Sequence, residues 1–192
     1  MPRGHVVPDR VWWPQRGTDG QYPLMGRTRH PHQWLKAVYR PGAPLITQID
    51  DGAVLPEAPT SNDAFISSLS CARVVVTMLR HLDPQPGETT LEIGTGTGYT
   101  TALLCHRLGD QAVTSIEVDT GLATTAAHRL GVLGVRPHLV TGDGTVPGQP
   151  LKSATGGGLA HPDRRPAVEG AEASVRTRLT NLRVRARHRT ST

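Results

Sequence analysis

Apolar residues recur with helical spacing over residues 72–82, where every third or fourth position is hydrophobic. After a break at "DPQPGE", the short apolar run "TTLEI" predicts a strand, and a second helical pattern covers residues 99–108. The runs "AVTSIEV" and "PHLVTGDG" predict two more strands, with a helix expected over residues 122–130 between them. Helices that alternate with strands in this order predict an α/β fold with a parallel sheet.

The composition divides the chain into three regions. Residues 1–60 are rich in Pro, Gly, Trp and His and contain one helix-like patch, "QWLKAVY", so we expect an N-terminal arm or lid with little regular structure. Residues 61–150 hold nearly all of the strong periodicity and form the predicted core. Residues 151–192 contain no Ile, Phe, Tyr or Trp, and we expect a disordered basic tail there.

The net charge of +5 comes from this tail. Residues 1–150 carry 12 basic and 13 acidic side chains, whereas residues 151–192 carry 9 and 3. A nearly neutral body lacks the basic surface typical of nucleic-acid binding, and we interpret the tail as a solvated segment. No apolar run is long enough to span a membrane, no secretory signal is recognised, and two cysteines make no disulfide framework. We expect a cytoplasmic monomer without bound metal or nucleic acid.

A glycine-rich turn follows the first predicted strand. Gly94, Gly96 and Gly98 stand at alternate positions, and Glu92 comes two residues before them. Glycine leaves room for a ligand to approach the backbone closely. The dinucleotide fingerprint G-x-G-x-x-G requires a third glycine where this chain has Tyr99, so the pattern does not match an NAD site. By itself such a turn is equally compatible with a plain structural loop.

Carboxylates follow the other two strands. Glu117 and Asp119 lie about twenty residues beyond the glycine turn, where an acidic side chain can accept hydrogen bonds from ribose hydroxyls. Asp143, in "GDG", can accept a hydrogen bond from an adenine amino group. Because ligands of parallel sheets bind at the carboxyl ends of the strands, the three turns together predict a nucleoside site without a pyrophosphate. S-adenosylmethionine is the obvious ligand of this kind.

The segments "LEIGTGTGYTTALLCHRLGD", "VTSIEVD" and "VTGDG" resemble the cofactor core of protein-L-isoaspartate O-methyltransferases. The segment "SLSCARVVVTMLRHLDPQPGE" is similar to the helix that precedes this core, and its Ser-x-Ser places Ser70 on the active-site serine of the family. A second interpretation is that Ser70 only caps the helix. "VVPDRVWW" and "WLKAVYRPGAPLITQIDDG" are similar to the leader of actinobacterial-type members, so the resemblance covers residues 3–144.

The resemblance implies a Rossmann-like class I fold that binds S-adenosylmethionine. Glu117 would hold the ribose, Asp143 and Gly144 would border the adenine, and the glycine turn would face the methionine part of the cofactor. The predicted cofactor-binding residues are Glu92, Gly94, Thr95, Gly96, Gly98, Tyr99, Glu117, Asp143 and Gly144. The implied reaction is methylation of the free carboxylate of L-isoaspartyl residues in proteins or peptides, with Ser70 as the catalytic residue.

The similarity ends after "GDG", because the following residues contain none of the later strands of the family. We therefore expect an incomplete sheet and a chain truncated or frameshifted after this motif. Three interpretations stay open: an isoaspartyl methyltransferase, a catalytically impaired fragment that keeps part of the nucleoside site, and a methyltransferase of a biosynthetic peptide. A fourth and weaker one is a basic nucleic-acid binder that acts through the tail.

Overall fold

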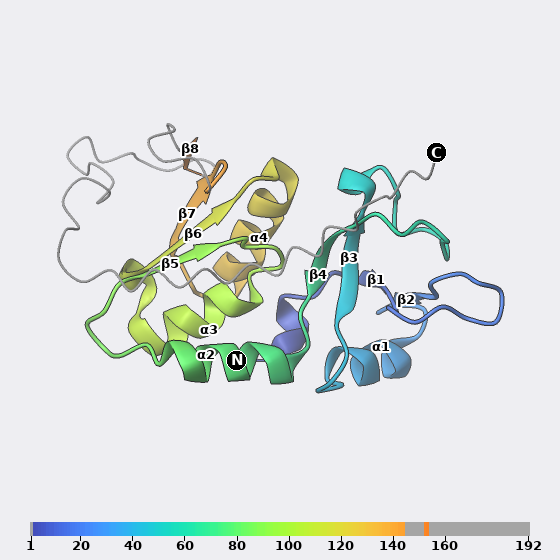
Figure 1. Ribbon diagram of the computed structural model, residues 1–192, viewed down its shortest axis with the longest axis horizontal. Helices are drawn as coiled ribbons and strands as arrows, with labels where there is room; N and C mark the ends of the chain where they lie inside the picture. The colour runs from blue at the N-terminus through green and yellow to red at the C-terminus, as the bar shows by residue number, and fades with distance from the viewer. Residues whose placement is uncertain (1, 145–151, 154–192) are drawn as a thin grey trace, which may run out of the picture.

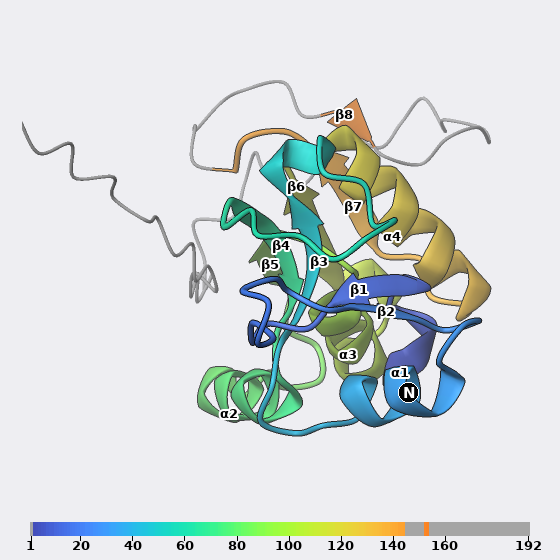
Figure 2. The same cartoon turned by 90° about the vertical axis from the view of Figure 1, so that its right-hand side faces the viewer.

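The computed structural model describes residues 2–144 and 152–153 of the chain, and it contains two four-stranded sheets (Figure 1). An antiparallel sheet is formed by the N-terminal part of the chain, and a mostly parallel sheet by the part that follows. In Figure 2, which faces the antiparallel side, β1–β4 lie in front of β5–β7. The first sheet therefore stands at one end of the second.

The antiparallel sheet has the strand order β2-β1-β3-β4. Its strands are β1 (Arg10–Trp12), β2 (Leu24–Gly26), β3 (Leu45–Ile49) and β4 (Phe65–Leu69), and helix α1 (Pro31–Val38) lies between β2 and β3 in the chain. Two short 3-10 helices cover Arg3–His5 and Asp50–Gly52. The helix-like patch is confirmed as α1, but the prediction of little regular structure for residues 1–60 is wrong. Strands of three to five residues are too short to give a clear periodicity.

Tryptophans fill the core of this sheet. Trp12 is fully buried, and its indole donates to the carbonyl of Ala58 at 3.0 Å. Trp34 packs on the other side, and its indole donates to the carbonyl of Pro8 at 3.2 Å. Burial of a large aromatic side chain contributes roughly 2–3 kcal/mol, provided that its polar atom is paired. These side chains give the N-terminal region a core that its polar composition does not suggest.

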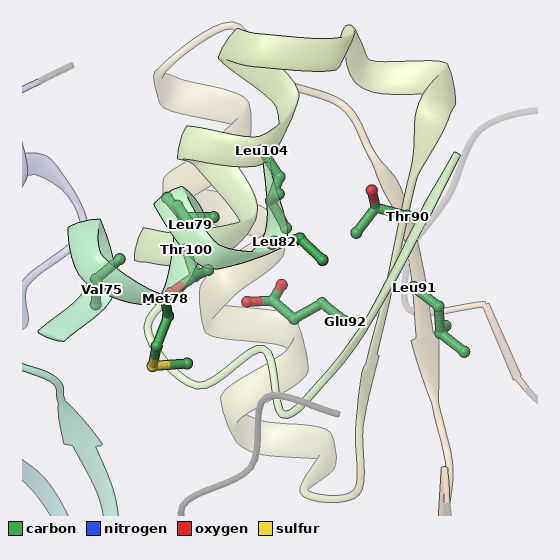
Figure 3. Close-up of a pocket in the computed structure, with 9 residues that line it drawn as sticks. All are labelled: Val75, Met78, Leu79, Leu82, Thr90, Leu91, Glu92, Thr100 and Leu104. Carbon is green, nitrogen blue, oxygen red and sulfur yellow. The ribbon is translucent and has the colours of Figure 1, made fainter. Parts of the chain in front are cut away.

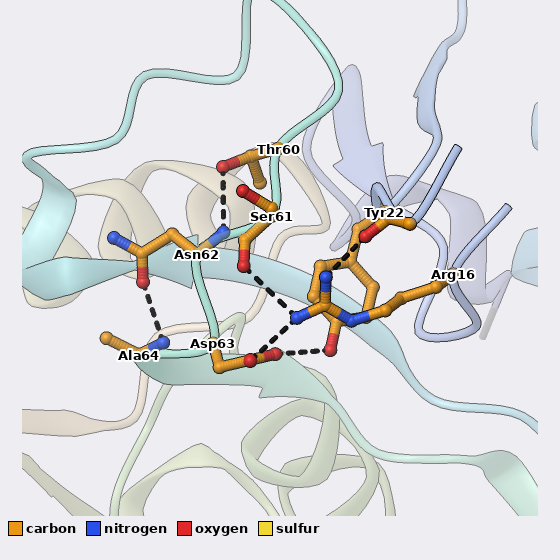
Figure 4. A network of polar contacts seen from close by, with 8 residues as sticks. Arg16, Tyr22, Thr60, Ser61, Asn62, Asp63 and Ala64 are labelled. Carbon is orange, nitrogen blue, oxygen red and sulfur yellow. Dashed lines mark hydrogen bonds and ion pairs between the residues drawn. The ribbon is translucent and has the colours of Figure 1, made fainter. Parts of the chain in front are cut away.

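A polar network ties the long connections of this sheet together (Figure 4). Arg16 forms an ion pair with Asp63 at 2.6 Å and donates to the carbonyl of Ser61 at 3.1 Å. The hydroxyl of Tyr22 donates to the same carboxylate at 2.5 Å, while Arg16 stacks over the tyrosine ring. The network joins the segment between β1 and β2 to the segment that leads into β4.

The second sheet contains the predicted α/β elements. Strands β5 (Thr90–Ile93), β6 (Val113–Glu117) and β7 (His138–Thr141) are parallel neighbours, which confirms the predicted sheet. The helices are α2 (Ala72–Leu82), α3 (Tyr99–Leu108) and α4 (Thr120–Val132), with a 3-10 turn at Asp110–Ala112. A short strand, β8 (Lys152–Ser153), pairs antiparallel with β7. The rest of the predicted disordered tail lies outside the described residues.

Apolar side chains of the helices pack against the strands in two clusters. One joins Ala102 of α3 and Leu130 of α4 to Leu139 of β7. The other joins Leu104 and Cys105 of α3 to Val113 of β6, with Leu79 and Leu82 of α2 packed against it. These contacts produce the layered arrangement of a Rossmann-like fold. In the described part of the chain, no helix is both long enough and apolar enough to cross a membrane.

Gly98 sets the angle between the glycine turn and α3. It occupies the N-cap position with φ of 83°, a backbone conformation that residues with a Cβ rarely adopt. A Cβ at this position would lie 3.2 Å from Cγ of Leu130, so α4 packs directly against the turn. The close approach explains why this position requires glycine.

The substitution Gly98→Ala should therefore destabilise the fold more than a glycine substitution that only strains the backbone. Gly87→Ala is the matched control, because Gly87 has φ of 92° and no atom within 4 Å of a built Cβ. The control should lose about 1–2 kcal/mol through backbone strain, and Gly98→Ala should lose about 1–3 kcal/mol more through crowding against Leu130. Urea unfolding of both variants tests this, and equal losses would contradict it.

Candidate functional site

The turns after β5, β6 and β7 meet at one edge of the parallel sheet. The amide of Gly94 donates to the carbonyl of Ile116 at 2.7 Å, and the amide of Gly142 donates to the carbonyl of Glu117 at 2.9 Å. These bonds continue the parallel pairing beyond the strands, so the turns stay in register with one another. The predicted meeting of the three polar turns is confirmed.

Glu117 joins the second turn to the glycine loop. Its Oε2 accepts a hydrogen bond from the amide of Gly96 at 2.8 Å, and its Oε1 accepts one from the amide of Asp119 at 3.2 Å. The residue is only 6% exposed. Carboxylates have about four lone-pair positions, so Glu117 can still accept further hydrogen bonds from a ligand.

The "GDG" turn returns from β7 across the sheet edge toward β5. A Cβ on Gly144 would lie 3.1 Å from Cγ2 of Ile93, the last residue of β5, although β6 lies between these two strands. A side chain at this position would crowd the isoleucine, so glycine allows the close approach of the backbone. Asp143 is thereby held on the same edge of the sheet as Glu117 and the glycine loop.

The antiparallel sheet supplies Gln48, a residue that the sequence did not single out. Its amide nitrogen donates to Oδ2 of Asp119 at 2.9 Å, while Oδ1 of Asp119 accepts from the amide of Leu122 and caps α4. The Oε1 atom of Gln48 is buried and has no hydrogen-bond partner among the described residues. Buried acceptors are ordinarily paired, with protein or with water.

Glu92 lies below this edge, in the layer between the sheet and the helices (Figure 3). Its Oε2 accepts hydrogen bonds from the hydroxyls of Thr101 at 2.5 Å and Ser115 at 2.7 Å. The hydroxyls of Ser115 and Thr95 are in turn 2.7 Å apart. The cluster connects β5, β6, α3 and the glycine loop, so Glu92 supports the loop from beneath.

Burial raises the pKa of Glu92 to about 7, the hydrogen bonds from Thr101 and Ser115 oppose this rise, and the charge of Glu117 adds to it. The carboxylate points toward a cavity of about 20 Å³ that is otherwise lined mainly by apolar side chains. These side chains come from α2, β5 and α3: Val75, Met78, Leu79, Leu82, Leu91 and Leu104. The apolar surroundings disfavour the charged form.

Two predicted cofactor residues turn their side chains into the protein. The hydroxyl of Thr95 faces Ser115, and the ring of Tyr99 packs against the buried cluster of the antiparallel sheet. The side chain of Thr95 is therefore buried, and that of Tyr99 is partly buried. The assignment of Glu92, Thr95 and Tyr99 as residues that contact the cofactor stays a prediction.

Ser70 is exposed at the junction of β4 and α2. It does not cap α2: the N-cap residue is Cys71, and its side chain makes no capping hydrogen bond. The carbonyl of Ser70 instead accepts a hydrogen bond from Nη2 of Arg3 at 2.6 Å, and the guanidinium of Arg3 lies 4.9 Å from the centre of the Tyr99 ring. The interpretation of Ser70 as a helix cap is therefore wrong.

Sequence reasoning missed Arg3, Gln48, Thr101 and Ser115. The last two carry little signal, because each stands beside a threonine in a helix or strand of mixed composition. Arg3 and Gln48 carry none, because their contacts involve residues 67 and 71 positions away. No cluster of three or more potential metal ligands exists among residues 2–144.

The raised pKa of Glu92 predicts a pH-dependent stability. The folded protein binds this proton more tightly than the unfolded chain, whose carboxyl has a pKa near 4.5. The free energy of unfolding should therefore fall as the pH rises from 4.5 to about 7, by an amount of order 3 kcal/mol. The isosteric substitution Glu92→Gln removes the titrating group and should flatten this part of the profile, as urea unfolding at several pH values will measure.

Glu57→Gln is the control, because Glu57 is an exposed carboxylate on a surface connection of the antiparallel sheet. It should keep the pH dependence of the wild type. A Glu92→Gln variant that loses as much stability as the wild type over the same pH range would show that Glu92 does not cause the effect.

A model of the family described as "Protein-L-isoaspartate(D-aspartate) O-methyltransferase (PCMT)" matches residues 43–151, which is more than half of the chain. The chain is 41% identical over 86 residues to a protein-L-isoaspartate O-methyltransferase of Anaeromyxobacter dehalogenans strain 2CP-1, an alignment covering 43% of this chain and 39% of that protein. It is 40% identical over 81 residues to the enzyme of the same name from Aeropyrum pernix, covering 41% and 31%.

The chain thus spans about a third to two fifths of the length of these curated relatives. The family match includes the three strand-end turns, the Glu92 cluster, Gln48 and Ser70, whereas Arg3 precedes it. By the extent of this match, the chain belongs to the protein-L-isoaspartate(D-aspartate) O-methyltransferase family.

Proposed function

We propose that this protein is an S-adenosylmethionine-dependent carboxyl methyltransferase that acts on L-isoaspartyl residues of proteins or peptides. The observation that carries the proposal is the arrangement at the sheet edge. There Glu117 holds the amide of Gly96, and Gly144 packs against the end of β5. The relatives named above bear the name of this activity.

The chemistry of the sheet edge fits the adenosine part of the cofactor. Glu117 would hold the ribose hydroxyls, and the buried Oε1 of Gln48 offers a second acceptor beside Asp119. Asp143 and Gly144 would border the adenine. Gly94, Gly96 and Gly98 would let the methionine part approach the loop backbone, since none of them has a side chain.

Little acid–base chemistry is required of the protein. The cofactor supplies, when bound, a methyl group on a positively charged sulfur. An isoaspartyl carboxylate, with a pKa near 4, is already ionised at neutral pH and needs no general base. The protein must instead orient the acceptor, and positioning of this kind can supply several kcal/mol. The hydroxyl of Ser70 would donate a hydrogen bond to one carboxylate oxygen and so direct the other oxygen toward the methyl group.

We further propose that the protein acts as a cytoplasmic monomer and uses neither a metal nor nucleic acid. The acceptor is an isoaspartyl residue in a damaged protein or in a dedicated peptide. A second candidate function is nucleoside binding without methyl transfer. This function would require only the strand-end turns, where Glu117 accepts from the amide of Gly96 and Gly144 packs against Ile93.

Calorimetric titration with S-adenosylhomocysteine tests the cofactor site, with NAD as the ligand control. We expect saturable binding of S-adenosylhomocysteine and none of NAD. The substitution Glu117→Ala should weaken binding by about 10- to 100-fold, because hydrogen bonds to a charged group contribute about 1.5–3 kcal/mol. Exposed Glu57→Ala is the matched variant and should bind like the wild type. A folded wild-type sample that binds neither ligand would refute the proposed cofactor site.

Methyl transfer to an isoaspartyl peptide tests the role of Ser70. The substitution Ser70→Ala should lower the transfer rate by about 10-fold or more, since it removes one oriented hydrogen-bond donor. It should leave the affinity for S-adenosylhomocysteine unchanged. Ser68→Ala, at another exposed serine two residues earlier, is the control. Cofactor binding without any transfer by the wild type would favour the nucleoside-binding alternative.

A further inference from the structure

Arg3 is a buried cation beside the proposed acceptor site. The residue is 4% exposed, and its Nη2 donates to the carbonyl of Ser70 at 2.6 Å. Its Nε and Nη1 atoms are also buried, and they have no hydrogen-bond partner among the described residues. Buried guanidinium groups are ordinarily paired, so two unpaired nitrogens call for an explanation.

No carboxylate of the described residues neutralises Arg3. The two ion pairs found in this part of the chain are Arg16–Asp63 and Arg27–Asp9. The titratable side chains near Arg3 are those of Tyr99, Cys71 and Tyr39, and none of them is a carboxylate. Burial lowers the pKa of Arg3, but an arginine side chain keeps its charge at neutral pH. The region under Ser70 therefore carries an uncompensated positive charge.

Two helix N-termini meet at the same place. Helix α2 begins at Ala72, two residues after Ser70, and helix α3 begins at Tyr99, whose ring lies against the guanidinium. The N-terminus of a helix carries partial positive charge. In α2 the amide of Arg73 already donates to the carbonyl of Pro41 at 3.1 Å, so this helix end contributes mainly through its partial charge, which has the same sign as the charge of Arg3.

We propose that Arg3 makes the Ser70 site selective for a negatively charged acceptor. Its guanidinium is buried beneath Ser70, so Arg3 is a positioning residue: it fixes the backbone of Ser70 and acts on the acceptor through its charge. This inference rests on the proposed function and adds the origin of the preference for a carboxylate. The incoming carboxylate supplies the counter-charge that the protein itself lacks at this point.

The test compares two peptides of the same sequence in the presence of S-adenosylhomocysteine. One contains an isoaspartyl residue, and the other contains the neutral amide of that residue. Calorimetry gives the affinity of each, and their ratio is the charge preference. We expect the wild type to bind the charged peptide about tenfold or more tightly than the neutral one, because the positive charge of Arg3 attracts a carboxylate more strongly in a buried environment than in water.

Two variants separate the charge of Arg3 from its hydrogen bond. Arg3→Gln keeps a donor for the Ser70 carbonyl but removes the charge, and it should abolish most of the charge preference while binding the neutral peptide almost as before. Arg3→Lys keeps the charge and should retain the preference. If Arg3→Gln weakens both peptides equally, its role is structural and the inference is overturned.

If the Arg3→Gln variant does not fold, as shown by the absence of a cooperative unfolding transition, the salt dependence of the wild type tests the inference instead. Its charge preference should then fall several-fold between about 50 and 500 mM NaCl, because salt screens the attraction. A preference that does not change with salt would overturn the inference, and so would the absence of any preference in a wild type that binds S-adenosylhomocysteine. Failure of the wild type to bind S-adenosylhomocysteine would instead refute the proposed function.

Discussion

The parallel register of β5, β6 and β7 is the constraint on which the site depends. Because the three strands run in the same direction, the turns that follow them are placed at one edge, although they are separated by about twenty residues in the chain. The hydrogen bond from the amide of Gly96 to Glu117 connects two of these turns directly. A shift of one residue in either strand pair would move these groups to opposite faces of the sheet.

Two buried ionisable residues support this edge in different ways. Oε2 of Glu92 accepts hydrogen bonds from two hydroxyls, and this network fixes the glycine loop to β6 and α3. Arg3 donates to one carbonyl and lies over an aromatic ring, and two of its nitrogens have no hydrogen-bond partner among the described residues. A satisfied buried network adds rigidity. A buried charge without a partner, such as that of Arg3, can be neutralised by a ligand of opposite charge.

The antiparallel sheet completes the site from outside the parallel one. Gln48 on β3 reaches Asp119, and β4 leads directly into the exposed Ser70. Tyr99, at the start of α3, packs into the cluster formed by this sheet and α1. The region expected to be an irregular arm is therefore part of the structure that holds both the proposed cofactor edge and the proposed acceptor position.

The helices and strands of residues 72–141 could be predicted from the amino-acid sequence, because their apolar periodicity is local and their turns contain glycine and acidic residues at characteristic positions. The same pattern indicated the strand-end residues Gly96, Glu117 and Gly144. The fold of residues 1–60 became evident from the three-dimensional structure alone, since strands this short are stabilised by pairing and by tryptophan burial rather than by pattern. The three-dimensional structure alone placed Arg3 under Ser70 and Gln48 beside Asp119, because contacts between residues so far apart in the chain leave no periodic trace in the sequence.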